Sequence, residues 1–470
     1  MSCVPSSTVT PAQTAPQSLA RRSFLAAGLG TSLLAVRAAA PARKEKLRIA
    51  AVGIGGMGKT YLEGCKDERI VALCDLDHTR TTTQEVFAAF PGAARYRDFR
   101  EMFDREAANF DALILATPDH THALIGLRAL ALGKHLYCAK PVAHSVAEVR
   151  RIRAAVRAAP HLVTKTSVQS SAGEGACRTA ELLRVGAIGP VAEVHVWCDH
   201  PAYPCGLVRP KDEPRPPEGM DWDLWLGPAP YRPYHPAYHP GNWRSWWDFG
   251  SGAVGDMCCH TLHTYFRELR LASPTAVYGT GSMRYDGFFE FVATPECQGH
   301  ANLVTWEYPA REELPPLRLH WYDGGMRPHR PAELDPGLEL PRSGVLFVGA
   351  EGKLLSAYSG GNPFAKQGRG VPGGLLLPEA KFRGYKSPAR TLPRCESGDH
   401  YREWIRSCKE GRPSLCPVDF GCEMTELGLL GAMALRTKRV LAWDAAAAHV
   451  TNHDAANAIV DPPSRDGWKI

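Results

Sequence analysis

The stretch "LRIAAVGIGGMG" (residues 47–58) decides the fold of this chain. Its first half is mostly apolar and predicts a β-strand, and its second half carries glycines 53, 55 and 58. Gly53 permits a tight turn, Gly55 lets the backbone approach a pyrophosphate, and Gly58 lets a helix and a strand pack closely. The stretch therefore predicts a dinucleotide-binding turn between a strand and a helix.

The residues around this turn sharpen the interpretation. Gly56 and Met57 lie where the helix begins, and the free N–H groups of a helix N-terminus attract phosphates. Asp75 ends the next apolar run, "IVALCD" (residues 70–75), about twenty residues after the first glycine. A carboxylate there accepts ribose hydroxyls and repels a 2′-phosphate, so NAD is favoured over NADP. The alternative is an ordinary strand–turn–helix of an α/β protein.

Short apolar runs alternate with helical periodicity up to about residue 165, which predicts an α/β fold with a doubly wound parallel sheet of the Rossmann type. The later strand-like runs, such as "HANLVTWEYP" and "GVLFVGAEGKLL", predict a second α/β domain with an open, mostly antiparallel sheet. The domains expected are an N-terminal segment (1–42), a Rossmann NAD-binding domain (43–165), a substrate and oligomerisation domain (166–443), whose late helices can return to the Rossmann domain, and a C-terminal tail (444–470).

The N-terminal segment has the pattern of an export signal. Residues 21–25, "RRSFL", open an apolar run that ends near Ala40 and is shorter than the ~20 residues of a membrane-spanning helix. Paired arginines point to the twin-arginine route, and hence to the twin-arginine export machinery as a partner and to the periplasm. A protein exported in this way must carry its dinucleotide tightly bound. The alternative is an N-terminus with a chance pair of arginines.

The composition excludes several classes of protein. Hydrophobic residues make up 44% and charged residues 22% of 470, which is typical of a globular chain. The net charge is only +6, and no long run of Lys or Arg follows the N-terminus, so we expect no nucleic-acid partner. The fourteen cysteines form no CxxC pair, and we interpret most of them as small buried apolar side chains.

The stretch "ATPDHTHA" (residues 116–123) follows an apolar strand, and ligands of such sheets bind at the carboxyl ends of the strands. Thr117, Pro118 and His122 are therefore candidate cofactor contacts. A helix capped by Asp119 or Thr121 explains the same residues equally well.

Lys140 ends the next strand, within "YCAKPVAHS" (residues 137–145). It would project at the sheet edge, where the nicotinamide lies in such folds, and could donate to a substrate oxygen. The alternative is a surface lysine at the end of a strand.

The stretch "SGAVGDMCCHTLH" (residues 251–263) places Asp256 and His260 four positions apart, on one face of a helix. An Asp that orients a His makes a plausible general base, and His263 would lie close by. A zinc site of these three residues, with Cys259, is an alternative that we rank below the acid–base pair, and we predict no resident metal. A third interpretation is a plain helix start with Asp256 near its positive end.

Candidate substrate contacts come from "NWRSWWDFGSG" (residues 242–252), because flat aromatic faces and an Arg fork suit sugar rings and hydroxyls. The alternative is that these Trp side chains form the core of a long loop. The side chains we expect to contact a sugar are Gln169, Arg244, Trp246, His263 and Tyr322.

Taken together, "GIGGMG", "VALCDLD", "ATPDHTHA", "AKP" and "WWDFGSGAVGDMCCH" resemble the Gfo/Idh/MocA oxidoreductases, and exported members most closely. The resemblance implies NAD(P) bound between a Rossmann and an α/β domain, a catalytic Lys in an "EKP" motif and an Asp-x-x-x-His pair. Lys140, Asp256 and His260 match. Ala139 stands where the family usually has Glu, which puts the usual proton path in doubt. The resemblance also implies a homo-oligomer.

Three functions remain open from the sequence. The first is an NAD-dependent oxidoreductase in which a sugar or glycoside hydroxyl loses its proton to His260 and its carbon-bound hydride to the nicotinamide, with Lys140 on the substrate oxygen. The second is a glycosidase that oxidises its substrate transiently, eliminates the leaving group and retains NAD. The third is a non-catalytic sugar-binding protein.

Overall fold

A computed structural model describes residues 45–469, which belong to one compact unit. The segment predicted as an export signal (1–42) lies outside the described residues. Within the described part, no helix combines the length and apolar character needed to cross a membrane.

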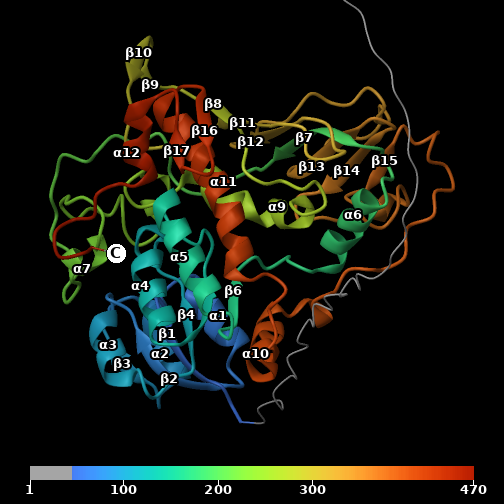
Figure 1. Cartoon of the computed structure of the whole chain (residues 1–470). Helices are drawn as coiled ribbons and strands as arrows, with labels where there is room; N and C mark the ends of the chain where they lie inside the picture. Colours follow the sequence, from blue (N-terminus) through green and yellow to red (C-terminus); the bar gives the residue numbers. More distant parts are fainter. Residues whose placement is uncertain (1–44, 470) are drawn as a thin grey trace, which may run out of the picture. The chain divides into compact units, whose positions relative to one another are not determined.

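The first sheet is the predicted parallel Rossmann sheet (Figure 1). Its strand order is β3-β2-β1-β4-β5-β6, and every neighbouring pair is parallel. The strands are β1 (Arg48–Val52), β2 (Arg69–Cys74), β3 (Ala94–Tyr96), β4 (Ala112–Leu115), β5 (His135–Cys138) and β6 (Thr164–Thr166).

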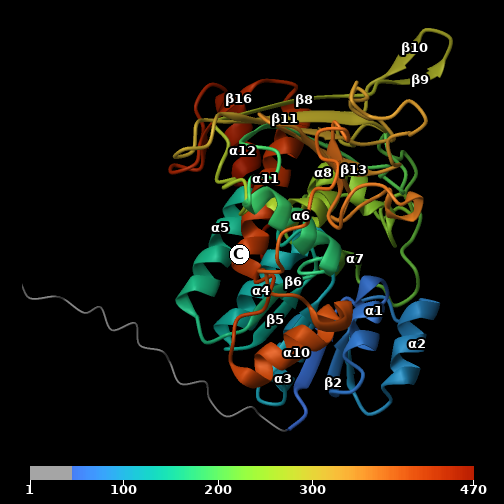
Figure 2. The ribbon, with the colours of Figure 1, turned by 90° about the vertical axis from the view of Figure 1, so that its right-hand side faces the viewer.

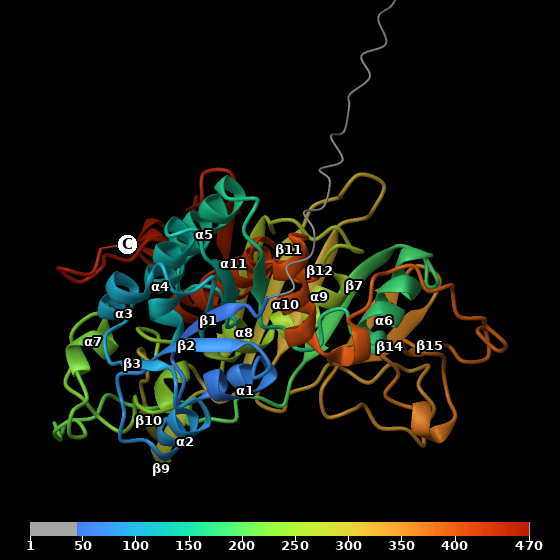
Figure 3. The same cartoon turned by 90° about the horizontal axis from the view of Figure 1, so that it is seen from below.

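Helices cover both faces of this sheet (Figure 3). They are α1 (Met57–Gly64), α2 (Thr81–Ala89), α3 (Phe99–Glu106), α4 (Asp119–Ala131) and α5 (Val146–Ala158). Side chains of α1 and α2 pack in one apolar cluster, and side chains of α3, α4 and α5 pack in another. The strand β4 is buried along its whole length, as expected for a central strand covered on both sides.

The second sheet is mixed and mostly antiparallel, with the order β15-β14-β13-β7-β12-β11-β8-β16-β17. Only β7 and β12 pair in parallel. Its strands are β7 (Val191–Trp197), β8 (Ala276–Gly281), β11 (Asn302–Tyr308), β12 (Leu317–Tyr322), β13 (Gly344–Gly349), β14 (Lys353–Ala357), β15 (Leu375–Leu377), β16 (Leu441–Asp444) and β17 (His449–Val450). The two sheets confirm the predicted fold class.

A hairpin of β9 (Arg284–Gly287) and β10 (Glu290–Val292) projects beside this sheet (Figures 1 and 2). The remaining α-helices are α6 (Glu174–Arg184), α7 (Trp222–Leu226), α8 (Gly252–Met257), α9 (Cys259–Tyr265), α10 (His400–Glu410), α11 (Val418–Thr437) and α12 (Asn457–Val460). The described residues also form the short 3-10 helices η1 (Asn242–Ser245), η2 (Ala365–Gln367), η3 (Glu396–Gly398) and η4 (Asp454–Ala456).

Two late helices connect the domains. The long helix α11 lies against α5 on one side and against α8 and β8 on the other (Figure 1). Helix α10 packs on the Rossmann sheet, where Trp404 is fully buried in the cluster that also holds Tyr61. The segment predicted as a tail is not separate either, because β17 pairs with β16 and Trp468 is buried.

An aromatic cluster occupies the long connection between β7 and α8. The rings of Trp222 and Trp225 stack with centroids 4.5 Å apart, and Trp246 is fully buried among their neighbours. His120 of α4 contacts the backbone oxygen of Trp225 at 2.9 Å, so the cluster is attached to the Rossmann domain. This attachment places residues 239–244 over the carboxyl ends of the parallel strands, where they line a cavity.

Candidate active site

A cavity of about 680 Å³ opens at the carboxyl ends of β1, β2, β4 and β5. Its floor is the glycine-rich turn and the strand ends, and its other walls come from residues 200–204, 239–244 and 256–260. The volume lies within the range of small-molecule and cofactor sites. The position is where doubly wound sheets bind ligands.

The glycines of the turn are required by close packing. Gly53 has φ +80°, and a Cβ there would lie 2.7 Å from the carbonyl carbon of Ala116. A Cβ on Gly58 would lie 2.0 Å from the oxygen of Gly53. Gly56 precedes α1 without a side-chain cap, and Gly56 and Met57 both line the cavity. A phosphate group fits such a helix start.

Asp75, a predicted cofactor contact, lines the cavity and also holds the glycine-rich turn in place. Its Oδ2 accepts hydrogen bonds from the backbone N–H groups of Ile54 and Gly55, both at 2.9 Å. Arg80, which the sequence analysis missed, lines the same end of the cavity close to Gly55. Its position after a helix-capping loop gave no signal in the sequence.

Thr117 and Pro118 line the cavity, whereas His122 does not. Its imidazole is buried, with Nδ1 2.7 Å from the oxygen of Pro141 and Nε2 2.7 Å from the oxygen of Thr117. Burial lowers the pKa of His122 to about 4. The position does not support the predicted cofactor contact, because His122 ties together the two turns that carry Thr117 and Lys140.

Asp119 is a cavity residue that sequence reasoning treated only as a helix cap. It lies inside the first turn of α4, fully buried, and Oδ2 accepts a hydrogen bond from Ser251 Oγ at 3.0 Å. Burial and the nearby negative charge of Asp256 raise the pKa of Asp119 to about 7. A carboxyl group that exchanges a proton near neutral pH therefore lies in the cavity wall.

Lys140 and Asp256 form an ion pair in the cavity, although they lie in different domains. Lys140 Nζ donates to the Asp256 carboxylate and, at 2.9 Å, to the backbone oxygen of Asp256. Burial opposes the charge on Lys140, but the attraction of Asp256 outweighs it and raises the pKa of Lys140. Burial likewise opposes the charge on Asp256, and Lys140 and Arg244 lower its pKa. The pair is therefore charged at neutral pH.

His260 lines the same cavity as Lys140. Burial, and then the charge of Lys140, lower the pKa of His260 to about 3, so its imidazole is neutral and can accept a proton. The expected bond between Asp256 and His260 is not seen: no hydrogen bond or ion pair joins them within residues 45–469. Asp256, in α8, pairs with Lys140 instead.

The predicted sugar contacts divide into two groups. Gln169 and Arg244 line the cavity, and the guanidinium of Arg244 lies 4.4 Å from the ring centroid of Trp243, another cavity residue from the aromatic stretch 242–252. Trp246 is fully buried, and its Nε1 donates to the oxygen of Ala237 at 2.9 Å. Its position is that of a core residue, which was the alternative interpretation.

The other two predicted contacts also lie off the cavity lining. Nε2 of His263 is 2.9 Å from Ser170 Oγ, beside the cavity residue Gln169. Tyr322 lies on β12, where its hydroxyl is 3.1 Å from Nδ1 of His195. His263 follows His260 by three positions, but its side chain contacts Ser170 in the loop between β6 and α6 and does not line the cavity, so spacing along a helix was insufficient to place it.

The zinc alternative is not supported by the geometry. Within the described part of the chain, the sets of three side chains close enough to share a metal ion are Glu193, His195 and His320, and Cys198, Asp199 and His200. Asp256, His260, His263 and Cys259 form no such set in this region.

The residues present fit a nicotinamide dinucleotide. The glycines Gly53, Gly55 and Gly56 of the turn, Asp75 after β2, and Lys140 and His260 all line the same cavity. The Rossmann sheet, the cavity at its carboxyl edge and the acid–base groups opposite it define a two-domain dinucleotide-binding protein.

Two family models match this chain. The model described as "Oxidoreductase family, NAD-binding Rossmann fold" of the Gfo/Idh/MocA proteins covers residues 47–166, and the "Oxidoreductase family, C-terminal alpha/beta domain" covers residues 204–277. Over these two segments the chain is similar to the Gfo/Idh/MocA oxidoreductases.

Curated relatives include the inositol 2-dehydrogenase of Klebsiella pneumoniae (strain 342), 28% identical over 162 residues. The alignment covers 33% of this chain and 45% of the relative, so the chain spans about half the length of the curated relatives it matches.

Solved structures share the fold. One is the WlbA dehydrogenase from Bordetella pertussis in complex with NADH and UDP-GlcNAcA, with TM-score 0.56 and 15% identity over 85% of this chain and 99% of that one. Another is the inositol dehydrogenase homolog from Azotobacter vinelandii in complex with NADH and myo-inositol, with TM-score 0.55 and 16% identity over 85% of this chain and 98% of that one.

Proposed function

We propose that this protein is an NAD-dependent oxidoreductase that acts on a hydroxyl group of a sugar, polyol or glycoside. The observation that carries the proposal is that a charged Lys140–Asp256 pair and a neutral His260 share one cavity with the glycine-rich turn. The fold is that of proteins solved with NADH and with inositol or a nucleotide sugar, which supports this class of substrate.

The nicotinamide, when bound, supplies the hydride acceptor. His260, neutral at physiological pH, accepts the proton of the substrate hydroxyl on its free ring nitrogen. Lys140 Nζ donates a hydrogen bond to the same substrate oxygen and stabilises the negative charge that develops there. Asp256 keeps Lys140 charged and aimed into the cavity. Gln169 and Arg244 are placed to hold the remaining hydroxyls.

Ala139 lines the cavity beside Lys140, where related proteins usually carry a Glu. Asp119 and Asp256 supply carboxyl groups in the same wall. We propose that Asp119, which titrates near pH 7, replaces the missing side chain as a proton acceptor of the site.

We further propose that the cofactor is NAD, held tightly, and that the protein is exported by the twin-arginine machinery to the periplasm. The carboxylate of Asp75, at the end of β2, favours NAD. Arg80 beside it is a cation that could bind the 2′-phosphate of NADP and so acts in the opposite direction. The "RRSFL" sequence supports export. A homo-oligomer is supported by Phe288 and Phe289 at the tip of the β9–β10 hairpin, which are 91% and 82% exposed.

A redox-neutral glycosidase is the second candidate function. The carboxyl group of Asp119, with a pKa of about 7, supports it, because elimination of a leaving group requires a proton donor besides the groups that handle the oxidised hydroxyl. Retention of NAD after export would also favour a cycle that returns its hydride.

Mass spectrometry of the dinucleotide that co-purifies with the protein tests these proposals. We expect NAD, and we expect it to become NADH when myo-inositol or an aldose is added. Cleavage of an aryl glycoside without added NAD would instead establish the second function. Absence of a bound dinucleotide together with intact sugar binding would establish a non-catalytic protein.

Variants separate catalysis from folding. Lys140→Met should lower kcat/KM by roughly 10²–10⁴-fold, the usual contribution of a positioned acid or base. Lys366→Met, which alters an exposed lysine of η2, is the matched control and should leave kcat/KM unchanged.

A further inference from the structure

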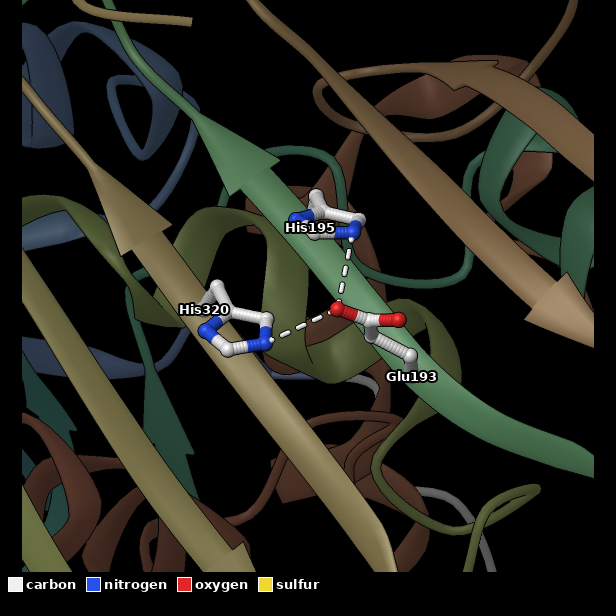
Figure 4. A group of neighbouring side chains, drawn as sticks. All are labelled: Glu193, His195 and His320. Atoms are coloured by element: carbon white, nitrogen blue, oxygen red, sulfur yellow. Dashed lines mark ion pairs between the residues drawn. The ribbon is translucent and has the colours of Figure 1, made fainter. Parts of the chain in front are cut away.

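Three side chains that bind metals in other proteins meet on one face of the second sheet, away from the cavity lining. Glu193 and His195 lie on β7, two residues apart and therefore on the same face, and His320 lies on the neighbouring strand β12 (Figure 4). The two strands pair in parallel with His320 opposite His195. The group is built by strand register, and the catalytic proposal uses none of its members.

The spacing of the three ligand atoms matches that around a metal ion. Glu193 Oε1 lies 3.3 Å from His195 Nε2 and 3.1 Å from His320 Nε2. Ligands about 2.0–2.1 Å from a tetrahedral zinc ion lie about 3.3–3.4 Å from one another. Figure 4 shows that both Nε2 atoms approach the same oxygen of Glu193, and the three ligand atoms all lie within 4.8 Å of one another.

The other ring nitrogens are held by hydroxyl groups. His195 Nδ1 lies 3.1 Å from Tyr322 Oη, and His320 Nδ1 lies 2.9 Å from Thr305 Oγ1. A metal-binding His usually donates its second N–H to such a partner, which fixes the ring and leaves the other nitrogen free for the metal. The two rings stack with centroids 4.9 Å apart. The arrangement fixes both Nε2 atoms toward Glu193.

The basic side chains near this group pair with carboxylates outside it. Arg318, opposite Glu193 on β12, pairs with Glu307 at 3.7 Å, and Lys353, on β14, pairs with Glu333 at 2.7 Å. Glu193 is 40% exposed and the two His side chains are 17% and 16% exposed, so an ion can enter from solvent.

We propose that Glu193, His195 and His320 bind one divalent transition-metal ion, of which zinc is the representative, with a coordination position left open toward solvent. Two imidazoles and one carboxylate are a ligand set that zinc accepts, and the open position can be filled by water or by a ligand from another molecule.

Titration of the full-length protein with zinc chloride, after dialysis against a chelator, tests this proposal. Calorimetry and elemental analysis should give one zinc per chain. Glu193→Gln and His320→Gln should each weaken binding by at least about tenfold, and circular dichroism should show that both variants remain folded. His235→Gln, which removes a His that pairs with Asp212 elsewhere, is the control and should bind zinc as the wild type does.

Cobalt(II) substitution distinguishes this group from Cys198, Asp199 and His200, the other set of potential ligands within the described residues. Binding at the proposed site gives a cobalt spectrum without thiolate-to-metal charge transfer. A thiolate band, or zinc binding that survives both Glu193→Gln and His320→Gln, would overturn the assignment. Absence of stoichiometric binding to the wild type would overturn it as well.

Discussion

The parallel and the mixed sheet of this protein build their polar sites in different ways. In the parallel sheet, the functional residues follow the ends of strands, so each belongs to a short motif with its own backbone requirement. In the mixed sheet, Glu193, His195 and His320 lie in the middle of strands and meet through register. The first kind of site can be recognised along the sequence, whereas the second depends on which strands become neighbours.

The largest effect is expected where a late helix joins the parallel sheet. Lys165 of β6 and Glu403 of α10 form a fully buried ion pair, with Nζ and Oε2 2.7 Å apart. Lys165→Met removes the nearer counter-charge of Glu403 and leaves only Arg412, at 3.8 Å, so we expect a loss of about 3 kcal/mol in the free energy of unfolding.

Urea unfolding measures this loss, and Lys366→Met, at an exposed position, is the control. Adding Glu403→Gln to Lys165→Met should recover part of the loss, because the uncompensated charge is then removed. Wild-type stability of the single variant would mean that α10 is not anchored to the sheet through this pair.

The next largest effect concerns how the stability of the protein depends on pH through Asp119, a residue of the cavity wall. Its pKa is about 7 in the folded protein against 3.8 for a free carboxyl, so the folded state binds the proton more tightly. The protonated Asp119 therefore contributes to the free energy of unfolding. This contribution is fully present below pH 4 and is lost as the pH rises to 7. Its size is as much as about 4 kcal/mol, at 1.36 kcal/mol for each unit by which the pKa is raised.

Asp119→Asn mimics the protonated carboxyl, so its free energy of unfolding should exceed that of the wild type increasingly between pH 4 and pH 8. Thermal and urea unfolding at several pH values give the difference. Asp104→Asn, at an exposed position, is the control, and its free energy of unfolding should change with pH as that of the wild type does. A constant difference between Asp119→Asn and the wild type over this range would show that Asp119 does not titrate there.

A smaller effect is expected at the glycine-rich turn. A Cβ at position 58 would lie 2.0 Å from the oxygen of Gly53, so Gly58→Ala must displace α1 from β1. We expect a loss of about 1–3 kcal/mol in stability and weaker dinucleotide binding. Gly92→Ala, where no atom lies within 4 Å of the added Cβ, is the control. Equal stability and dinucleotide affinity in both variants would refute the packing role of Gly58.

The smallest effect concerns the choice of cofactor. Asp75→Asn keeps an oxygen that can accept the N–H groups of Ile54 and Gly55 but removes the negative charge. With Arg80 nearby, the ratio of NADP to NAD affinity should rise about tenfold, or about 1.4 kcal/mol. Calorimetric titration of both dinucleotides measures the ratio. An unchanged ratio would show that Asp75 acts on the turn alone.

The sequence predicted the positions of the residues in short motifs better than those of the expected sugar contacts. The glycines, Thr117, Pro118, Lys140 and His260 lie around the cavity because each follows a strand or opens a helix at a fixed place in the fold. Trp246 and Tyr322 were chosen by side-chain chemistry alone, and one lies in the aromatic cluster and the other on the face of the mixed sheet.

The sequence by itself determined the two-sheet architecture and the glycine-rich turn, because periodicity and glycine spacing express local backbone requirements. Only the tertiary structure decided that Lys140 pairs with Asp256, that His260 stands apart from Asp256, and that His195 lies opposite His320. The Lys140–Asp256 and His195–His320 contacts join residues far apart in the chain. Their geometry follows from strand register and from the packing of the two domains, which no local pattern encodes.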